Sequence, residues 1–375
     1  MNNRAMIWER TWAEIDLGAL RHNSDPIRGS LPAGVKLCCV VKANGYGHGA
    51  SKLAPLYQQL GADWFAVSNI EEAMQLRRAG VTRPVLILGY THPSCAELLA
   101  DNGFSQCVYS AEYGRLLSAA ATACGTTVKV HIKLDTGMGR LGFQVTGEGE
   151  DSVSGAIATC RLAGLEPEGV FTHFATADFA DKSFAGEQYA KFERFIELCK
   201  ERGVEFEHIT CDNTAAAMEM PVTAKTEVRI GIGLYGYYPS DEVKSDLELT
   251  PAMTIKSHIV SVKEIEAGQS VGYGRTFTAQ RKTRLATIPI GYADGYPRLL
   301  SNKGYVLING QRAPIIGNVC MDMFMVDITD IDAHDGDEVI AMGEGIDADT
   351  IAKMCQTISY EIICGIGSRV KRVYI

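Results

Sequence analysis

The sequence has no apolar stretch long enough to cross a membrane, and it has no excess of positive charge. A membrane-spanning helix needs about 20 consecutive apolar residues, so we expect no contact with the membrane. Asp and Glu (45) outnumber Lys and Arg (36), which gives a formal net charge of −9. This balance argues against binding to nucleic acid or to an anionic lipid surface. An anionic cofactor stays possible, because a few local donors can hold one phosphate.

Cysteine pairs and a secretion signal are also missing. The eleven cysteines include no Cys-x-x-Cys spacing, and Cys38, Cys39 and Cys211 lie inside apolar runs. We therefore expect small buried thiols in a reducing compartment, with no metal site and no disulfide framework. The first ten residues lack an apolar core followed by a small-residue cleavage site. This absence predicts a cytoplasmic protein.

Apolar runs and helical spacing alternate through the first two thirds of the chain. Strand-like runs occur at residues 36–41, 64–68, 85–89, 107–110, 128–134, 169–173, 207–211 and 227–231. Helices are predicted near Leu17, over Ala50–Leu60 and over Ser183–Arg202, where Ser183 is the predicted N-cap. Strands separated by helices imply parallel βαβ units, and eight of them predict a (β/α)8 TIM-type barrel over residues 1–242. A doubly wound open sheet is the alternative.

The pattern changes past Gly236. Short β-rich segments alternate there with Gly and Asp-Gly turns, which predicts a mainly β C-terminal domain over residues 243–375. The strand-like segment at residues 11–16 precedes the barrel strands and could pair into that domain. The predicted fold class is therefore α/β, a barrel followed by a mainly β domain.

A lysine stands at the end of the first barrel run. Residues 35–41 lead directly into Lys42 and the glycine-rich turn Ala43–Gly49, and loops at this end of parallel strands hold the chemistry of α/β folds. Burying an unpaired ammonium is costly, so a lysine held there can lose its proton and form a Schiff base. The alternative is a lysine that extends to solvent beside a structural turn. The local pattern alone leaves both open.

Polar residues also mark the ends of four further predicted strands. They are Lys133, Asp135, Arg140, His173, Asn213, Thr214, Arg229 and Gly231. Any one of them alone is more often structural, but five such strand ends together predict an active site. The segment Arg229–Gly233 offers backbone N–H groups to a phosphate, and Thr214 offers a hydroxyl.

Several of these segments resemble one family. VVKANGYGHG (residues 40–49) resembles the lysine motif of the alanine racemases, which are barrel-type pyridoxal-phosphate enzymes. DTGMGRLG (135–142), Arg229–Gly231, SVGYGR (270–275) and NVCMD (318–322) are similar to further motifs of that family. The resemblance implies an isomerase that interconverts L-alanine and D-alanine through a pyridoxal 5'-phosphate aldimine. Its physiological role would be to supply D-alanine for peptidoglycan in the cell wall.

The resemblance also implies roles for single residues. The two opposed catalytic bases would be Lys42 and Tyr273 of the partner subunit, so that a working site requires a homodimer. The cofactor would be held by Lys42, Tyr46, His173, Asn213, Thr214, Arg229, Gly231, Ile232 and Tyr360, with a threonine at 214 where the family more often has serine. Arg229 would face the pyridine nitrogen and keep it unprotonated, because arginine does not give up its proton. His173 would connect Arg229 to Tyr273.

The remaining implied roles concern the substrate. Arg140, Tyr292 and Met321 would bind the amino acid, with Arg140 paired to its carboxylate. Lys133, Cys320 and Asp322 would support them, and Lys133 would be carbamylated, as in many relatives, to orient Arg140. Segments 291–295 and 359–361 would form the pocket entrance.

Three alternatives stay open. A racemase for another small amino acid such as serine would share these motifs. A barrel-type decarboxylase would carry an acidic residue in place of Arg229, which weighs against that reading. A non-catalytic pyridoxal-phosphate carrier would lack the second domain. Tyr360, Met321 and the absent secretion signal weigh against broad-specificity racemases.

Overall fold

The structure is a computed structural model that describes residues 10–145, 150–220, 223 and 225–375. The prediction that no signal peptide is present was made from the first ten residues. Residues 1–9 lie outside the described residues. The chain divides into two compact units. The barrel unit comprises Arg21–Gly45 and Gly49–Thr250, and the C-terminal unit comprises the chain up to Leu20, Tyr46–His48 and Pro251–Ile375. The domain boundary at residues 242/243 stays a prediction.

Eight parallel strands form the core of the barrel unit in the order β10-β2-β3-β4-β5-β6-β8-β9. They are β2 (Lys36–Val40), β3 (Trp64–Val67), β4 (Val85–Ile87), β5 (Phe104–Val108), β6 (Val128–Asp135), β8 (Leu165–Phe171), β9 (His208–Thr210) and β10 (Glu227–Ile230). The two ends of this order meet, because the Arg229 N–H donates to the Asp212 carbonyl at 3.0 Å and the Thr226 N–H to that of Ile209 at 3.1 Å. The predicted barrel is confirmed, and an open doubly wound sheet is wrong.

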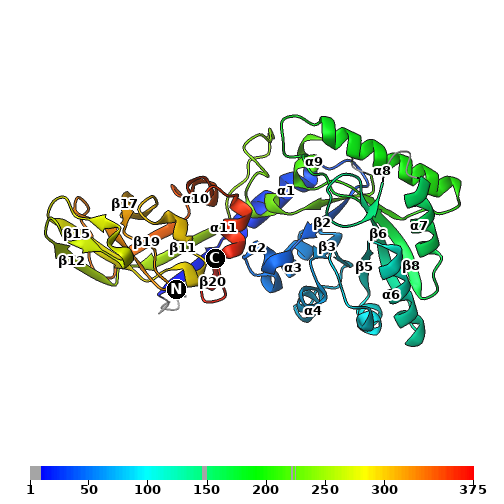
Figure 1. The fold of residues 1–375 in the computed structure, drawn as a ribbon, viewed down its shortest axis with the longest axis horizontal. Helices are drawn as coiled ribbons and strands as arrows, with labels where there is room; N and C mark the ends of the chain where they lie inside the picture. The colour runs from blue at the N-terminus through cyan, green and yellow to red at the C-terminus, as the bar shows by residue number, and fades with distance from the viewer. Residues whose placement is uncertain (1–9, 146–149, 221–222, 224) are drawn as a thin grey trace. The chain divides into compact units, whose positions relative to one another are not determined.

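Helices cover the outside of these strands (Figure 1). They include α3 (Ala50–Gln59), α4 (Ile70–Arg78), α5 (Ala96–Asp101), α6 (Ala111–Ala123), α7 (Glu150–Cys160), α8 (Ser183–Glu201) and α9 (Thr214–Glu219). The apolar face of α8 buries Phe192, Phe195 and Leu198, as helical spacing of apolar residues requires. The prediction of Ser183 as N-cap is wrong. Lys182 takes that position, and the Ser183 N–H donates to Asp181 Oδ1 at 2.9 Å.

The C-terminal unit is built on a nine-stranded sheet in the order β12-β15-β18-β17-β16-β19-β11-β1-β20. Its strands are β1 (Thr11–Ile15), β11 (Met253–His258), β12 (Ser261–Ile265), β15 (Thr283–Ile288), β16 (Tyr305–Ile308), β17 (Gln311–Ile316), β18 (Phe324–Asp327), β19 (Glu338–Met342) and β20 (Lys371–Tyr374). Strand β1 pairs antiparallel with β11 and parallel with β20, which confirms that the first strand joins this sheet. The unit also holds a hairpin, β13 (Ser270–Val271) with β14 (Phe277–Thr278), and helices α10 (Ala348–Cys355) and α11 (Ser359–Gly365).

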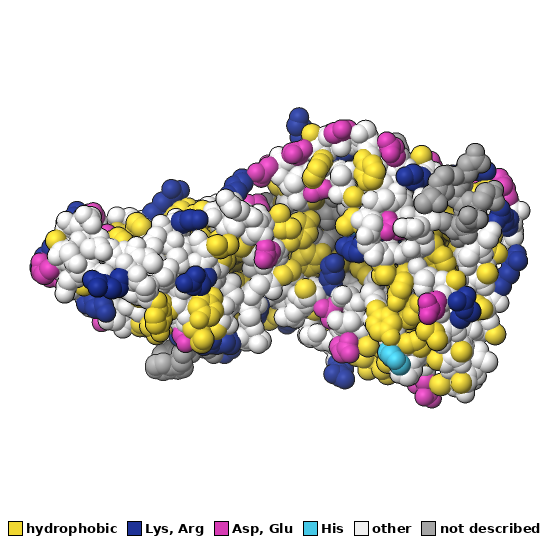
Figure 2. Space-filling view, viewed as in Figure 1, with side chains coloured by type: hydrophobic (Ala, Val, Ile, Leu, Met, Phe, Trp, Pro, Cys, Tyr) yellow, Lys and Arg dark blue, Asp and Glu magenta, His cyan; other side chains and the backbone are white. Residues whose placement is uncertain are grey.

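Within the described ranges, no helix is long and apolar enough to span a membrane. Figure 2 shows the surface chemistry of one face of the molecule. Lys and Arg side chains are dispersed over this face, with Asp and Glu side chains lying among them.

Candidate active site

Lys42 follows β2 directly and begins an unusual turn. Ala43, Asn44, Gly45 and Tyr46 all have positive φ angles, between 50° and 62°. The left-handed conformation costs roughly 1–2 kcal/mol for each residue other than glycine, so the surrounding structure must hold the turn in place. Within the barrel unit, the Gly45 N–H donates to the Val41 carbonyl at 2.8 Å, and the Ala50 N–H donates to Asn44 Oδ1 at 3.1 Å. The glycine-rich segment therefore fixes the backbone that carries Lys42.

Glu72, in the first turn of α4, also holds this turn. Its carboxylate accepts the Ala43 N–H and the Ser68 N–H, each at 2.7 Å. Sequence reasoning missed this residue. The available signal was the spacing of Asn69 and Glu72 ahead of an apolar helical pattern, which is typical of a capped helix start. That spacing does not reveal a contact with residue 43.

Arg229 lies in β10 with 4% of its surface exposed. Its terminal nitrogens donate to Thr210 Oγ1 at 2.8 Å and to the carbonyls of Thr172 and Cys211 at 2.8 and 3.2 Å. Burial lowers the pKa of this guanidinium, but arginine stays charged because its ordinary pKa is so high. Among the described residues, none of its hydrogen bonds uses Nε, so this N–H is left to meet a further acceptor.

His173 lies two residues past β8, beside Arg229. Its Nδ1 is 3.3 Å from an Arg229 terminal nitrogen, and a guanidinium can only donate. Nδ1 therefore accepts, and the ring proton sits on Nε2. Burial lowers the pKa of His173 well below its ordinary value, and the positive charges of Arg229, Arg140, Lys133 and Lys42 lower it further. The imidazole is neutral at physiological pH.

Lys133 lies within β6 rather than after it, with 5% of its surface exposed. Its ammonium donates to the Leu134 carbonyl and stands 5.3 Å from the centre of the Phe171 ring. The Arg229 guanidinium contacts the same ring at 5.5 Å, so two cations share one aromatic side chain. Burial lowers the pKa of Lys133 to about 8, and Arg229 and Arg140 contribute.

The loop after β6 is organised by Asp135. Its carboxylate accepts the backbone N–H groups of Gly137, Gly139 and Arg140 at 2.9 to 3.0 Å. Burial alone would raise the pKa of Asp135, but these three hydrogen bonds outweigh it and the pKa is lowered. The charged carboxylate therefore folds the loop that presents Arg140 at the surface.

A group of hydrogen-bond donors follows the carboxyl ends of β9 and β10. Asn213 caps α9 by accepting the Ala216 N–H at 3.0 Å, which places Thr214 in the first turn. The Thr214 hydroxyl accepts the Gly231 N–H at 2.9 Å and keeps its own proton to donate. Ile232 begins the short helix η3 (Ile232–Tyr235), and the first backbone N–H groups of a helix lack intrahelical acceptors. This set of donors suits an anion.

Two of the predicted phosphate ligands belong to the C-terminal unit. The rings of Tyr46 and Tyr360 lie 6.0 Å apart between centres, and Tyr360 is in α11. Gly47 packs on the same helix so closely that a Cβ would overlap the Ile363 carbonyl oxygen, and its φ is +81°. Burial raises the pKa of Tyr46 well above its ordinary value, so this phenol keeps its proton.

Tyr273 lies in a tight loop of the C-terminal unit between β13 and β14. Its side chain is 76% exposed, and Asn318 Nδ2 donates to its carbonyl at 2.8 Å. A backbone hydrogen bond connects Tyr292 to the same loop, because the Tyr292 N–H donates to the Cys320 carbonyl at 3.1 Å. The segments around Tyr273, Tyr292 and Asn318–Asp322 therefore form one connected surface.

Two of the predicted substrate residues, Met321 and Tyr292, lie on that surface, whereas Arg140 belongs to the barrel unit. Met321 is 52% exposed and Tyr292 is 44% exposed. Asp322 accepts a hydrogen bond from Arg369 at 2.8 Å, which fixes the end of the loop. Cys320 is half-buried, and its thiol donates to the Asn318 carbonyl at 3.4 Å.

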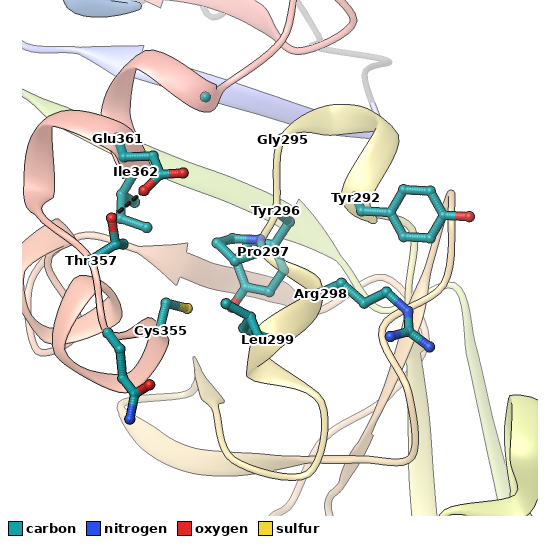
Figure 3. A pocket seen from close by; sticks show the side chains of 12 residues that line it. Tyr292, Gly295, Tyr296, Pro297, Arg298, Leu299, Cys355, Thr357, Glu361 and Ile362 are labelled. Atoms are coloured by element: carbon teal, nitrogen blue, oxygen red, sulfur yellow. Dashed lines mark hydrogen bonds between the residues drawn. The ribbon is translucent and has the colours of Figure 1, made fainter.

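A pocket of 470 Å³ lies beside Tyr292 in the same unit (Figure 3). Tyr292 and Gly295 line it from the predicted entrance segment at 291–295, and Glu361 lines it from the segment at 359–361. Glu361 accepts a hydrogen bond from Thr357, which is drawn as a dashed line. The structure thus brings both predicted entrance segments to one pocket.

Comparison with known proteins extends over nearly the whole chain. The family model "Alanine racemase, N-terminal domain" matches residues 15–239, and "Alanine racemase, C-terminal domain" matches residues 252–374. The chain belongs to the alanine racemase family. An alanine racemase of Clostridium perfringens (strain SM101 / Type A) is 46% identical over 369 residues, which cover 97% of this chain and 95% of the relative.

Solved structures of the alanine racemase family share the fold. That of Clostridium difficile 630 superposes with a TM-score of 0.93 at 42% identity, covering 98% of this chain and 96% of the other. The structure of alanine racemase from Bacillus anthracis with bound L-Ala-P has a TM-score of 0.93 at 35% identity. The match covers 98% of this chain and 96% of the other. The predicted family, fold class, enzyme class and pyridoxal-phosphate dependence are confirmed.

The donor set of this alanine racemase family member fits its cofactor. Lys42 offers a primary amine that can bind an aldehyde. The hydroxyl of Thr214 and the N–H of Ile232 offer donors for a phosphate, and the buried Arg229 has an Nε–H that donates to none of the described residues. All four lie at the carboxyl ends of barrel strands or just past them. The barrel unit therefore contains a primary amine, donors that suit a phosphate and a buried guanidinium, which are the groups that this cofactor needs.

Proposed function

We propose that Lys42 and Tyr273 of the partner subunit are the two opposed bases with which this alanine racemase interconverts L-alanine and D-alanine. Family membership supports the reaction and its cofactor. The observation that carries the assignment to this site is the position of Lys42, at the carboxyl end of β2 in the same unit as buried Arg229. When bound, pyridoxal phosphate supplies an electron sink that acidifies the Cα–H of the amino acid.

Lys42 and Tyr273 divide the proton transfers. The neutral amine of Lys42 takes or returns the Cα proton on one face of the substrate, and the phenol oxygen of Tyr273 does so on the other. Racemisation requires both, because a proton removed from one face must be replaced from the opposite one. The exposure of Tyr273 supports a role across a dimer interface.

Arg229 governs the cofactor environment. Its guanidinium carries a fixed charge, and we propose that its Nε–H faces the pyridine nitrogen. An arginine has no proton to give at neutral pH, so the ring stays a moderate electron sink. This arrangement limits side reactions that need a longer-lived carbanion.

We propose that His173 links Arg229 to Tyr273 of the partner subunit through hydrogen bonds. Its Nδ1 accepts from Arg229, and its Nε2 has no hydrogen-bond partner among the described residues. We propose that this N–H donates to Tyr273 of the partner subunit. A donor next to the positive charges of Arg229 and Arg140 favours the phenolate over the phenol.

Substrate binding is assigned to Arg140, Met321 and Tyr292. Arg140 pairs with the substrate carboxylate through its planar fork of donors. A carbamate on Lys133 orients Arg140, because an anion attracts the guanidinium whereas an ammonium repels it. Asn213 contributes by capping α9 and so placing the Thr214 hydroxyl, while Cys320 and Asp322 hold the loop that presents Met321.

The dimer, the compartment and the physiological role belong to the same proposal. Exposed apolar side chains at Tyr273, Met321, Met323 and Tyr292 lie on the C-terminal unit, and exposed apolar groups often mark protein interfaces. We propose a cytoplasmic homodimer with shared active sites that supplies D-alanine for peptidoglycan. Racemisation of serine and decarboxylation have no comparable support, since the relatives named above are alanine racemases and an arginine stands at 229.

Borohydride trapping tests the proposal. Reduction of the loaded protein should fix the cofactor to a peptide that contains residue 42, and a circular-dichroism assay should show interconversion of alanine enantiomers. Lys42→Ala should lose both the visible absorbance and the label, whereas Lys52→Ala, in α3 of the same unit, should keep both. A label on another lysine would refute the assignment.

A further inference from the structure

Glu72 connects the ends of two neighbouring barrel strands. Its Oε1 accepts the N–H of Ala43, which follows β2, and its Oε2 accepts the N–H of Ser68, which follows β3. Both distances are 2.7 Å, which is typical of hydrogen bonds to a charged acceptor. The Glu72 N–H in turn donates to the capping side chain of Asn69 at 2.9 Å.

This arrangement differs from an ordinary capped helix start. A glutamate at the third position of a helix commonly reaches back to the N–H of the N-cap residue itself. Here it passes Asn69 and reaches one residue further, and its second oxygen extends to a segment 29 positions earlier in the chain. The carboxylate therefore connects the segments that follow β2 and β3, and it does not cap its own helix.

The contact fixes the peptide group between Lys42 and Ala43. Ala43 opens the left-handed turn with a φ of 51°, a conformation that its side chain disfavours. The hydrogen bond from its N–H to Glu72 holds that peptide plane in orientation. The direction in which the Lys42 side chain leaves the backbone depends on the same plane.

We propose that Glu72 is a positioning residue for Lys42, holding the amine on its face of the substrate during proton transfer. The inference rests on the proposed role of Lys42 as one of the two bases. Proton transfer requires the base within hydrogen-bond reach of the Cα proton, and a displacement of about 1 Å can cost about 100-fold in rate. Tyr273 belongs to a different unit and does not share this support.

Glu72→Gln tests the proposal, with Glu71→Gln as its matched control. The amide keeps the size of the side chain, but it turns one acceptor into a donor facing a backbone N–H. Glu71 is exposed in the same helical turn, so its substitution removes the same charge without touching the Lys42 turn. We expect Glu72→Gln to lower kcat/KM on the order of tenfold and Glu71→Gln to leave it unchanged.

Isotope effects separate positioning from general damage. With α-deuterated alanine, the primary isotope effect should rise for the enantiomer whose proton Lys42 removes and should not rise for the other. Glu72→Asp keeps the charge but shortens the side chain, so its primary isotope effect should also rise for that one enantiomer only. Hydrogen exchange of the peptide over residues 41–49 should accelerate in Glu72→Gln and not in Glu71→Gln.

Three results would overturn the inference: isotope effects equal to those of Glu71→Gln, an equal rise for both enantiomers, or a Glu72→Asp protein that behaves as wild type. If Glu72→Gln fails to fold, Glu72→Asp decides alone. Failure of the proposed function itself is distinguishable, because borohydride would then label a lysine other than Lys42 in the wild-type protein.

Discussion

The charge of Arg229 is stabilised inside the barrel by hydrogen bonds to Thr210 Oγ1 and to the carbonyls of Thr172 and Cys211, and by the Phe171 ring. Replacing it with glutamate would let the pyridine nitrogen bind a proton and make the cofactor a stronger electron sink. Arg229→Glu should therefore racemise at least about tenfold more slowly and should transaminate measurably, with pyruvate as the product to assay. Arg312→Glu, at a surface strand of the C-terminal unit, is the control. Unchanged racemisation without pyruvate would place Arg229 away from the ring.

The pKa of Lys133 bears directly on its predicted carbamate. Only a neutral amine adds CO2, forming an N–C bond and releasing a proton. With a pKa of about 8, about one amine in ten is neutral at pH 7, against about one in three thousand for an ordinary lysine. Bicarbonate labelled with ¹³C should give a carbamate resonance that strengthens as the pH rises towards 8. The signal should vanish in Lys133→Ala and persist in Lys129→Ala, from the same strand. A wild-type spectrum without the resonance would contradict the carbamate.

At the scale of single residues, the sequence was sufficient to predict the charged and titratable residues of the site. It was not sufficient to predict the residues that hold them in position. Lys42, Arg229 and His173 stood out because charged or titratable groups are rare at the ends of apolar runs. Glu72 was missed because its partners are backbone N–H groups, and a sequence does not record where they lie. The glycines predicted a turn after Lys42, but four consecutive left-handed residues follow only from the folded chain.

At the scale of elements, the barrel strands were predictable because parallel strands buried on both faces are nearly continuous apolar runs. The predictions for β5 and β8 were displaced, at 107–110 and 169–173 instead of Phe104–Val108 and Leu165–Phe171. The reason is that the first half of β5 contains the buried polar residues Ser105 and Gln106, and β8 includes Glu168, which sequence patterns assign to loops. Helices α10 and α11 were not predicted, because they are short and interrupt a β-rich region.

Glu168 is the polar group that ties β8 to its neighbours. It accepts a hydrogen bond from Ser105 in β5, and it pairs with Lys129 and His131 in β6 at 3.2 and 3.3 Å. Burial by itself would raise the pKa of Glu168, but the neighbouring side chains of His131, Ser105 and Lys129 lower it to about 2. A depressed carboxyl pKa contributes stability that is complete above the ordinary value of 4.5 and is lost as the pH falls towards 2.

Glu168→Gln should lose that contribution. We expect a decrease of about 1–3 kcal/mol in the free energy of unfolding at pH 7 and a shallower loss of stability between pH 4.5 and 2. Denaturant unfolding across this pH range measures both. Glu166→Gln, exposed in the same strand, should match the wild type. Equal acid sensitivity in Glu168→Gln and the wild type would show that Glu168 is not the group responsible.

At the scale of the whole molecule, the proposed active site needs two chains. Lys42 belongs to the barrel unit, and Tyr273 is exposed in a loop of the C-terminal unit. Neither unit alone contains both proposed bases. If Tyr273 serves the site of the partner subunit, then defects in Lys42 and Tyr273 placed on different chains should complement each other.

Mixing Lys42→Ala and Tyr273→Phe subunits tests this arrangement. Each variant alone should be nearly inactive, because every site lacks one base. A heterodimer with shared sites has one site without either base and one intact site, so it should recover about half of the wild-type activity. Tyr305→Phe, another tyrosine of the C-terminal unit, should be active alone and serves as the control for loss of a phenol. If Tyr273 acts within its own chain, each site in the heterodimer still lacks one base. No recovery, with subunit exchange demonstrated by mass spectrometry, would therefore refute the shared site while leaving the barrel assignments standing.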